Sequence, residues 1–258
     1  MDRVAHDGRT TAYRRTRGDA DGPVVLYVHG SGATHRVWVR QYAPSGPPHP
    51  AVALDLSGHG DSDDVDADAG AETLEAYARD VVAVAKQARA EVLVGNSLGG
   101  AVAQWVALET DWTPAAMVLT GTGPQLPVFD GLREWLADDF ERAVDFLHGR
   151  DRLFHDADEP TVNRSREQMA AVGQAVTRRD FLTCHAFDVR ERLAEIDVPV
   201  LALCGEHDKL TPREYHETLA REIPAGEVAF VPDAAHLAMI ERSDQFNDAV
   251  SAFLDDVL

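Results

Sequence analysis

A serine set between two glycines is the residue of this sequence best suited to covalent chemistry. The stretch EVLVGNSLGG, residues 91–100, reads as a buried strand that turns through Gly95-x-Ser97-x-Gly99 into a helix. A sharp strand-to-helix turn exposes the serine hydroxyl, and the flanking glycines avoid steric collision. The start of the helix also favours developing negative charge. The pattern therefore indicates Ser97 as a nucleophile for acyl transfer.

A nucleophilic serine needs a histidine to take its proton and an acid to orient that histidine. In open parallel sheets these groups follow the serine in the order acid, then histidine, on loops at the carboxyl ends of strands. Asp208 follows the apolar run VPVLALCG, and His236 follows the run EVAFVP. The order predicts Ser97 as nucleophile, Asp208 as orienting acid and His236 as general base.

Two neighbours of these residues offer alternatives for the acid, and a third is a histidine that could be mistaken for the base. Glu206 and Asp233 also follow the last two apolar runs and could serve as the acid. His207 adjoins Asp208, so it is not expected to face Ser97 from the same loop.

The elements that must position these loops alternate between short apolar runs and helical patterns, which predicts an α/β fold. We expect a mostly parallel, roughly eight-stranded sheet with helices on both faces. A hairpin is expected over residues 3–17, and the further strands are expected over 23–30, 51–56, 91–96, 115–121, 198–205 and 227–232. Helices are expected over 73–89, 97–109, 212–222 and 243–257.

No strand is expected between residues 121 and 198. Apolar residues recur at helical spacing from Asp130 to near Gly149, and a second helix is expected from Pro160 to about Val176. The sequence thus predicts a core formed by residues 1–121 and 189–258, with a helical lid inserted as residues 122–188.

The composition indicates one large folded domain with an acidic surface. The 258 residues are 45% hydrophobic, and 44 acidic residues against 24 basic ones give a formal charge of −20. Only Lys86 and Lys209 are lysines. Such a surface resembles that of proteins from extreme halophiles, where salt screens the self-repulsion; an ordinary acidic protein is the alternative. Nucleic acid would be repelled.

Three features of the sequence indicate the cellular compartment. Its start lacks the pattern of a secretory signal, and its longest uncharged run is too polar for a bilayer centre. Cys184 and Cys204 are far apart, without CxxC spacing, and are expected to be buried thiols. We expect a cytoplasmic protein that does not bind membranes, and the sequence carries no signal for an oligomeric state.

Two motifs that would indicate a different function, a dinucleotide site and a calcium-binding loop, are incomplete. GSGATH at 30–35, with Asp55 after the next strand, echoes a dinucleotide site, but His35 stands where the last glycine is needed. Asp64, Asp66, Asp68 and Glu75 fall at calcium-loop positions, but residue 69, where glycine is required, is alanine. Neither HExxH nor paired cysteines occur. No cofactor and no metal are therefore expected.

Five segments resemble the α/β-hydrolase superfamily over nearly the whole chain: HGSG (29–32), DLSGHGDS (55–62), GNSLGG (95–100), GEHDKLTP (205–212) and AHLAMIE (235–241). The resemblance implies the Ser97, Asp208 and His236 triad and an oxyanion hole from the backbone N–H groups of Ser31 and Leu98. It also implies a helical lid after the sixth strand. Alanine at position 235, where the family usually has glycine, is one departure.

In the same motifs, His29 and His59 are expected to hold loops rather than to react. The leading hypothesis is hydrolysis of carboxylic esters with small to medium acyl chains through an acyl-enzyme. Carbon-carbon bond hydrolysis is an alternative, although Leu237 stands where such relatives carry tryptophan. Enol-lactone hydrolysis and a receptor that binds without turnover are the others. The expected partner is a small ester or ketone.

Overall fold

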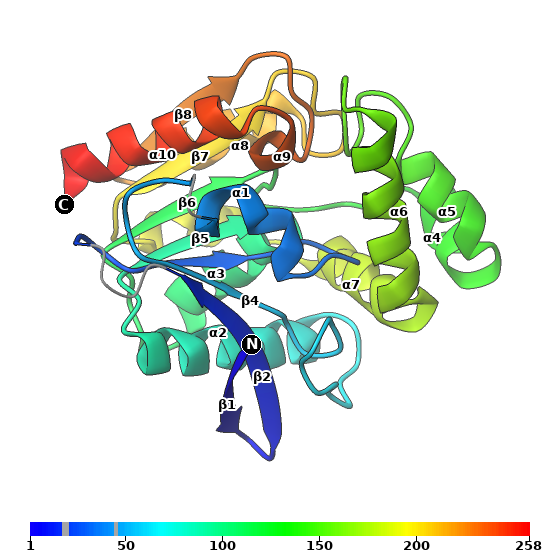
Figure 1. The fold of residues 1–258 in the computed structure, drawn as a ribbon, viewed down its shortest axis with the longest axis horizontal. Coiled ribbons are helices and arrows are strands. Elements are labelled where there is room, and N and C mark those ends of the chain that lie inside the picture. The colour runs from blue at the N-terminus through cyan, green and yellow to red at the C-terminus, as the bar shows by residue number, and fades with distance from the viewer. Residues whose placement is uncertain (17–20, 44–45) are drawn as a thin grey trace.

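A computed structural model describes residues 1–16, 21–43 and 46–258. One sheet of eight strands crosses the molecule in the order β1-β2-β4-β3-β5-β6-β7-β8 (Figure 1). The strands are β1 (Asp2–His6), β2 (Arg9–Thr16), β3 (Val25–Val28), β4 (Ala51–Leu54), β5 (Val92–Asn96), β6 (Ala116–Thr120), β7 (Val200–Gly205) and β8 (Gly226–Val231). β1 and β2 are antiparallel to each other, β2 is antiparallel to β4, and all remaining pairs are parallel. The predicted mostly parallel sheet of eight strands is confirmed.

The first two strands form the expected hairpin. His6 pairs with Arg9, and the two residues between them have positive φ, 47° at Asp7 and 76° at Gly8. Two adjacent residues of positive φ match the twist of antiparallel strands, and the Asp-Gly pair suits that turn. Residue 17, where the expected hairpin ended, lies outside the described residues.

The helices flank the sheet on both sides. α2 (Ala71–Ala88) packs against α3 (Leu98–Glu109), and α1 (Val39–Tyr42) packs against α10 (Ser243–Val257). Figure 1 shows these two pairs on opposite sides of the sheet. α8 (Arg213–Glu222) covers β7 and β8, and α9 (Ala238–Glu241) leads into α10. The four helices expected for the core are present within two residues of their predicted ends, whereas a short 3-10 turn at His35–Trp38 and α1 were not predicted.

The central strands form the core. Every residue of β3, β4, β5, β6 and β7 is buried, so both faces of the sheet are covered. This is why these strands read as continuous apolar runs rather than as alternating ones. Their carboxyl ends meet at one edge, where the loops that carry the candidate residues begin.

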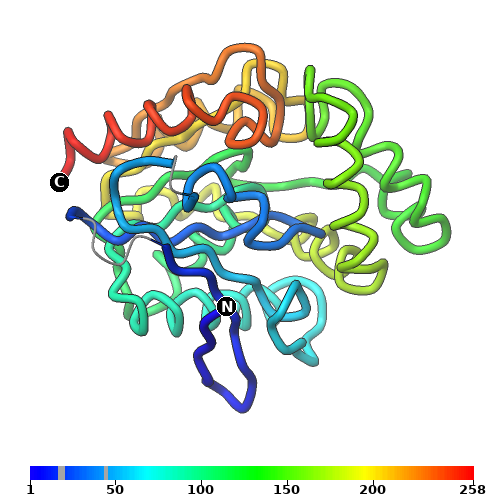
Figure 2. The backbone as a smooth tube through the Cα atoms, in the orientation of Figure 1, coloured from blue at the N-terminus to red at the C-terminus, as the bar shows by residue number. Residues whose placement is uncertain are grey.

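Four α-helices, not two, lie between β6 and β7: α4 (Asp130–Asp138), α5 (Phe140–Leu147), α6 (Glu159–Val172) and α7 (Gln174–Ala186), and the 3-10 helix η2 (Arg190–Glu195) follows them. Figure 2 shows them gathered beside one end of the sheet. The single helix expected from Asp130 to near Gly149 is wrong, because Asp139 interrupts it and caps α5 by accepting a hydrogen bond from Arg142 N at 3.2 Å. The helix expected to reach Val176 ends at Val172, because Gly173 adopts a φ of 89°.

Within the described part of the chain, no helix combines the length and the apolar character needed to cross a lipid bilayer.

Candidate active site

Ser97 lies at the sharp turn between β5 and α3. Its backbone has φ 55° and ψ −118°, a conformation that L-residues rarely adopt, and it caps the amino terminus of α3. A Cβ atom at Gly95 would lie 2.2 Å from Gly99 O, and one at Gly99 would lie 2.4 Å from Val28 O. The two flanking glycines are therefore required by close backbone contacts, as the sequence pattern predicted.

His236 and Asp208 meet behind this turn. His236 Nδ1 lies 2.9 Å from Asp208 Oδ2, and both side chains are buried. Asp208 Oδ2 also accepts a hydrogen bond from Thr211 Oγ1 at 2.6 Å, while Oδ1 accepts from Leu210 N at 2.8 Å and from Thr211 N at 3.0 Å. These contacts fix the carboxylate, and through it the histidine ring, in one orientation.

The environment of Asp208 keeps it charged. Burial acts to raise the pKa of its carboxyl, but His236 and the donors of Thr211 outweigh burial and hold the pKa below its usual value. Because Asp208 accepts from His236 Nδ1, the neutral ring leaves Nε2 free to accept a proton.

The two alternative acids do not contact the histidine. Glu206 and Asp233 are exposed, and neither has a hydrogen bond to His236 among the described residues. Of the acids considered from the sequence, Asp208 is the one brought to His236.

A cavity of about 250 Å³ joins Ser97 and His236. Its other walls come from the loop of Ser31, from the loop of Leu210, and from the residues between β6 and β7. Most of the side chains that line it are apolar, among them Leu126, Val128, Phe129, Leu132, Phe146, Met169, Phe181 and Leu237. Such a site suits a small molecule with a largely apolar body.

Two backbone N–H groups near Ser97 are candidates for stabilising an oxyanion. Leu98 N opens α3, and Ser31 lies on the cavity wall between Gly30 and Gly32. Neither N–H donates to an acceptor elsewhere in the described residues. Unpaired donors beside a nucleophile can bind a negatively charged oxygen.

The loop of Ser31 is held by a buried carboxylate from α7. Asp180 Oδ2 accepts hydrogen bonds from Gly32 N at 3.1 Å and from His59 Nε2 at 2.9 Å, and Oδ1 accepts from Tyr77 Oη at 2.8 Å. Asp180, His59 and Tyr77 are each fully buried. This network ties an inserted helix to the core directly beside the cavity.

His59 and His29 hold loops, as expected, but in different charge states. The ring nitrogens of His59 face two acceptors, Asp180 Oδ2 and Ser57 O at 3.1 Å, so both carry protons. Burial acts to lower the pKa of His59, yet Asp180 outweighs it and the pKa is raised. His29 Nδ1 faces Gly30 O, but its Nε2 accepts from Leu56 N at 3.1 Å, so this ring is neutral. Burial and the neighbouring His59 lower its pKa to about 4.

Backbone carbonyls from the inserted segment support the histidine loop. Arg152 O accepts from His236 N at 3.1 Å, and Leu153 O accepts from Leu237 N at 3.0 Å. The carboxylate of Glu241 accepts from Ala235 N at 2.8 Å and from His155 N at 2.9 Å. The loop is therefore held from both sides.

Sequence reasoning missed these supporting residues. Thr211 had a usable signal, because an acid followed two and three residues later by free N–H groups often forms a local turn. Glu241 closes the AHLAMIE segment and bonds Ala235 only six residues away, so that segment was its signal. Asp180 and Arg152 had none, since their partners lie far away in the sequence. Asp55, the acid of the dinucleotide-like pattern, is buried and accepts hydrogen bonds from His35 N at 2.7 Å and Asp61 N at 3.1 Å.

Comparison with known proteins is consistent across sequence and structure. A family model described as "Alpha/beta hydrolase family" matches residues 25–249. A pimeloyl-[acyl-carrier protein] methyl ester esterase of Pectobacterium carotovorum subsp. carotovorum (strain PC1) is 30% identical, over 94% of this chain and 98% of that protein. A 3-oxoadipate enol-lactonase 1 of Acinetobacter baylyi is 23% identical, over 93% and 91%. The solved structure of a thermophilic esterase is 32% identical, has a TM-score of 0.86 and covers 99% of this chain and 97% of that one.

Proposed function

The chain belongs to the alpha/beta hydrolase family, and we propose that it is a serine esterase that cleaves carboxylic esters with small to medium acyl chains. The observation that carries this proposal is the placement of Ser97 and His236 on one apolar cavity, with Asp208 bound to His236 Nδ1. The similarity to esterases at 30% and 32% identity supports the same class of reaction.

In the proposed reaction, Ser97 Oγ attacks the ester carbonyl carbon while His236 Nε2 takes the hydroxyl proton. The carbonyl oxygen becomes an oxyanion, which the N–H groups of Leu98 and Ser31 bind. The carbon-oxygen bond of the ester then breaks, and His236 returns the proton to the departing alkoxide. A water molecule activated by His236 hydrolyses the acyl-enzyme by the same steps in reverse order, which releases the acid and restores Ser97.

Residues 122–188 are proposed to act as a lid that shapes the acyl pocket. Val128, Phe129, Leu132, Phe146 and Met169 from this segment line the cavity and supply much of its apolar wall. Apolar contact with the acyl chain then sets which esters are preferred.

Enol-lactone hydrolysis is a second candidate, favoured by the similarity to the Acinetobacter baylyi enol-lactonase. An enol-lactone is a cyclic ester, so the same nucleophile, base and oxyanion donors would serve. The two candidates differ in the shape of the substrate and not in the chemistry.

The proposal extends to the working environment, which we infer to be a cytoplasm of high salt. The formal charge of −20 supports this inference, because dissolved salt would screen the repulsion between the many carboxylates of the folded chain. Both cysteines are free and buried, which suits a reducing compartment.

The proposed function is tested by hydrolysis of p-nitrophenyl acetate, butyrate and octanoate in molar KCl. The wild-type chain is expected to turn over these esters, Ser97→Ala to lose the activity, and Ser251→Ala on α10 to keep it. Circular dichroism establishes that each variant is folded. Steady-state turnover that survives in Ser97→Ala would overturn Ser97 as nucleophile. Binding without turnover in the wild-type chain would favour a receptor, and faster cleavage of an enol-lactone would favour the second candidate.

A further inference from the structure

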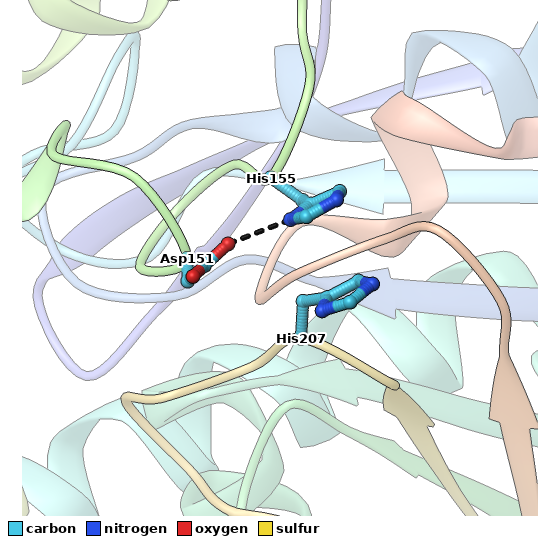
Figure 3. A group of neighbouring side chains, drawn as sticks. All are labelled: Asp151, His155 and His207. Atoms are coloured by element: carbon cyan, nitrogen blue, oxygen red, sulfur yellow. Dashed lines mark hydrogen bonds and ion pairs between the residues drawn. The ribbon is translucent and has the colours of Figure 1, made fainter.

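Two histidines and an aspartate that the proposed reaction does not use lie together beside the loop after β7, which carries the orienting acid Asp208 and is called the catalytic-acid loop below. Asp151 and His155 come from the segment between α5 and α6, and His207 comes from the loop after β7, directly before Asp208. Figure 3 shows Asp151 facing His155, with the His207 ring beneath that of His155. Each residue offers one ligand atom, and these atoms all lie within 4.8 Å of one another.

The contacts within this group leave ring nitrogens without protein partners. His155 Nδ1 lies 2.6 Å from Asp151 Oδ1, and the rings of His155 and His207 stack with centroids 3.6 Å apart and planes 6° apart. Among the residues that the structure describes, neither His155 Nε2 nor either ring nitrogen of His207 has a hydrogen-bond partner. An imidazole nitrogen without a protein partner can serve as a ligand for a metal ion.

The donor set selects a class of ion. Two imidazoles and one carboxylate suit zinc and its neighbours among the transition metals, whereas calcium and magnesium prefer oxygen ligands alone. Bonds of about 2.0–2.1 Å to nitrogen and oxygen would place tetrahedral ligand atoms roughly 3.3 Å apart. An ion that replaces the proton between His155 Nδ1 and Asp151 Oδ1 would need only a small separation of these atoms. The His207 ring must turn out of the stack, since one ion cannot lie in two parallel ring planes.

The surroundings permit such an ion. All three side chains are partly exposed, so water can reach a fourth coordination position. A chain with a formal charge of −20 attracts divalent cations. The present competitor is Lys209, whose Nζ lies 2.6 Å from Asp151 Oδ2 and whose side chain is 68% exposed, so it can move into solvent.

We propose that Asp151, His155 and His207 form a binding site for a divalent transition-metal ion of the zinc class. The ion would link the inserted segment to the catalytic-acid loop. The same segment supplies the carbonyls of Arg152 and Leu153 that hold His236 N and Leu237 N. Metal binding is therefore expected to stabilise the arrangement of loops around the proposed base.

Isothermal titration calorimetry of the full chain with zinc chloride, after treatment with a chelator, tests this site. We expect one zinc ion per chain and a raised melting temperature, with no comparable effect of magnesium or calcium. His155→Gln and His207→Gln should each weaken binding at least tenfold. Asp151→Asn should also weaken it, and asparagine tolerates the φ of 61° at this position.

Two further variants separate this site from other surface ligands. His185→Gln removes an exposed imidazole on α7 and should leave zinc affinity unchanged. Lys209→Met removes the competing ammonium group and should strengthen zinc binding. Absence of zinc binding by the wild-type chain would overturn the proposal. Affinity that survives in both His155→Gln and His207→Gln would also overturn it, and would place the ion elsewhere, for example at His236.

Discussion

Asp208 Oδ2 and His236 Nδ1 lie 2.9 Å apart in a buried pair, and Thr211 holds the carboxylate through its hydroxyl and its N–H group. The pair joins the loops that follow β7 and β8, two strands that are neighbours in the sheet. The acid can therefore orient the ring without itself reaching the cavity.

Asp208→Asn is expected to lower kcat by about 10³–10⁴-fold, because the amide can donate to His236 Nδ1 and so favour the wrong tautomer. Steady-state kinetics with p-nitrophenyl butyrate measures this loss. Glu206→Gln and Asp233→Asn change exposed acids and should retain the wild-type rate. A variant Asp208→Asn with nearly full activity would show that another group orients the base.

The buried pair of His59 and Asp180 predicts a pH-dependent contribution to stability. The pKa of His59 is raised above its unfolded value of 6.5, since Asp180 outweighs the effect of burial. A group whose folded pKa is raised stabilises the protein fully below the unfolded pKa, and this stabilisation is lost as the pH rises through the folded pKa. The stabilisation is thus present at pH 6 and diminished at pH 9.

His59→Gln should destabilise the protein by about 3 kcal/mol at pH 6, because it leaves the buried carboxylate of Asp180 without its cationic partner. The difference in the free energy of unfolding between the two proteins should be smaller at pH 9. Denaturant unfolding at both pH values provides the measurement. An equal difference at both pH values would mean that His59 is not charged in the folded chain.

The acidic surface predicts that stability depends on salt. Raising KCl from low to molar concentration shortens the screening length to about 3 Å, so repulsion among the excess carboxylates decreases. The melting temperature of the wild-type chain should therefore rise by several degrees. A flat or falling melting temperature would contradict a halophilic protein.

Salt also acts on apolar burial, so a matched variant is needed to isolate the charge effect. Asp66, Asp68, Asp255 and Asp256 have exposed side chains, and changing all four to asparagine removes four negative charges. This variant should gain less stability from KCl than the wild-type chain. If KCl stabilises the variant and the wild-type chain equally, the stabilisation by salt comes from apolar burial and not from charge screening.

The core of the fold could be predicted because its signals are local. Each buried strand is a short apolar run, and each core helix has its own apolar stripe. The inserted helices were predicted less well, because their ends depend on single residues. Asp139 caps α5 and so divides a continuous apolar pattern, while Gly173 ends α6 by its positive φ.

In the candidate site, too, the residues with a local sequence signal could be predicted and those without one could not. Ser97, Asp208 and His236 each follow a strand within a short motif, so sequence order suffices to propose them together. Asp180 and His59 are 121 positions apart, and no local pattern connects them. The group of Asp151, His155 and His207 likewise comes from two loops, which is why a search for metal-binding motifs does not find it.

The aromatic wall of the cavity predicts how acyl-chain preference can be changed. Phe146 lines the cavity, and its ring centroid lies 5.0 Å from that of Phe129 and 5.4 Å from that of Trp135. The Arg152 guanidinium lies 3.7 Å from the Phe146 centroid. These contacts fix the ring as a wall, so removing it should lengthen the space for an acyl chain.

Phe146→Ala should therefore raise the ratio of kcat/KM for p-nitrophenyl octanoate to that for the acetate. Each additional buried methylene contributes about 0.8 kcal/mol, or roughly fourfold in kcat/KM, so two or three newly accommodated methylenes would change the ratio by more than tenfold. Phe253→Ala on α10 removes a buried aromatic ring that does not line the cavity, and it should lower stability without changing the ratio. Steady-state kinetics on both esters distinguishes the two variants. If the ratio is the same in Phe146→Ala and in the wild-type chain, the acyl chain does not lie against this wall.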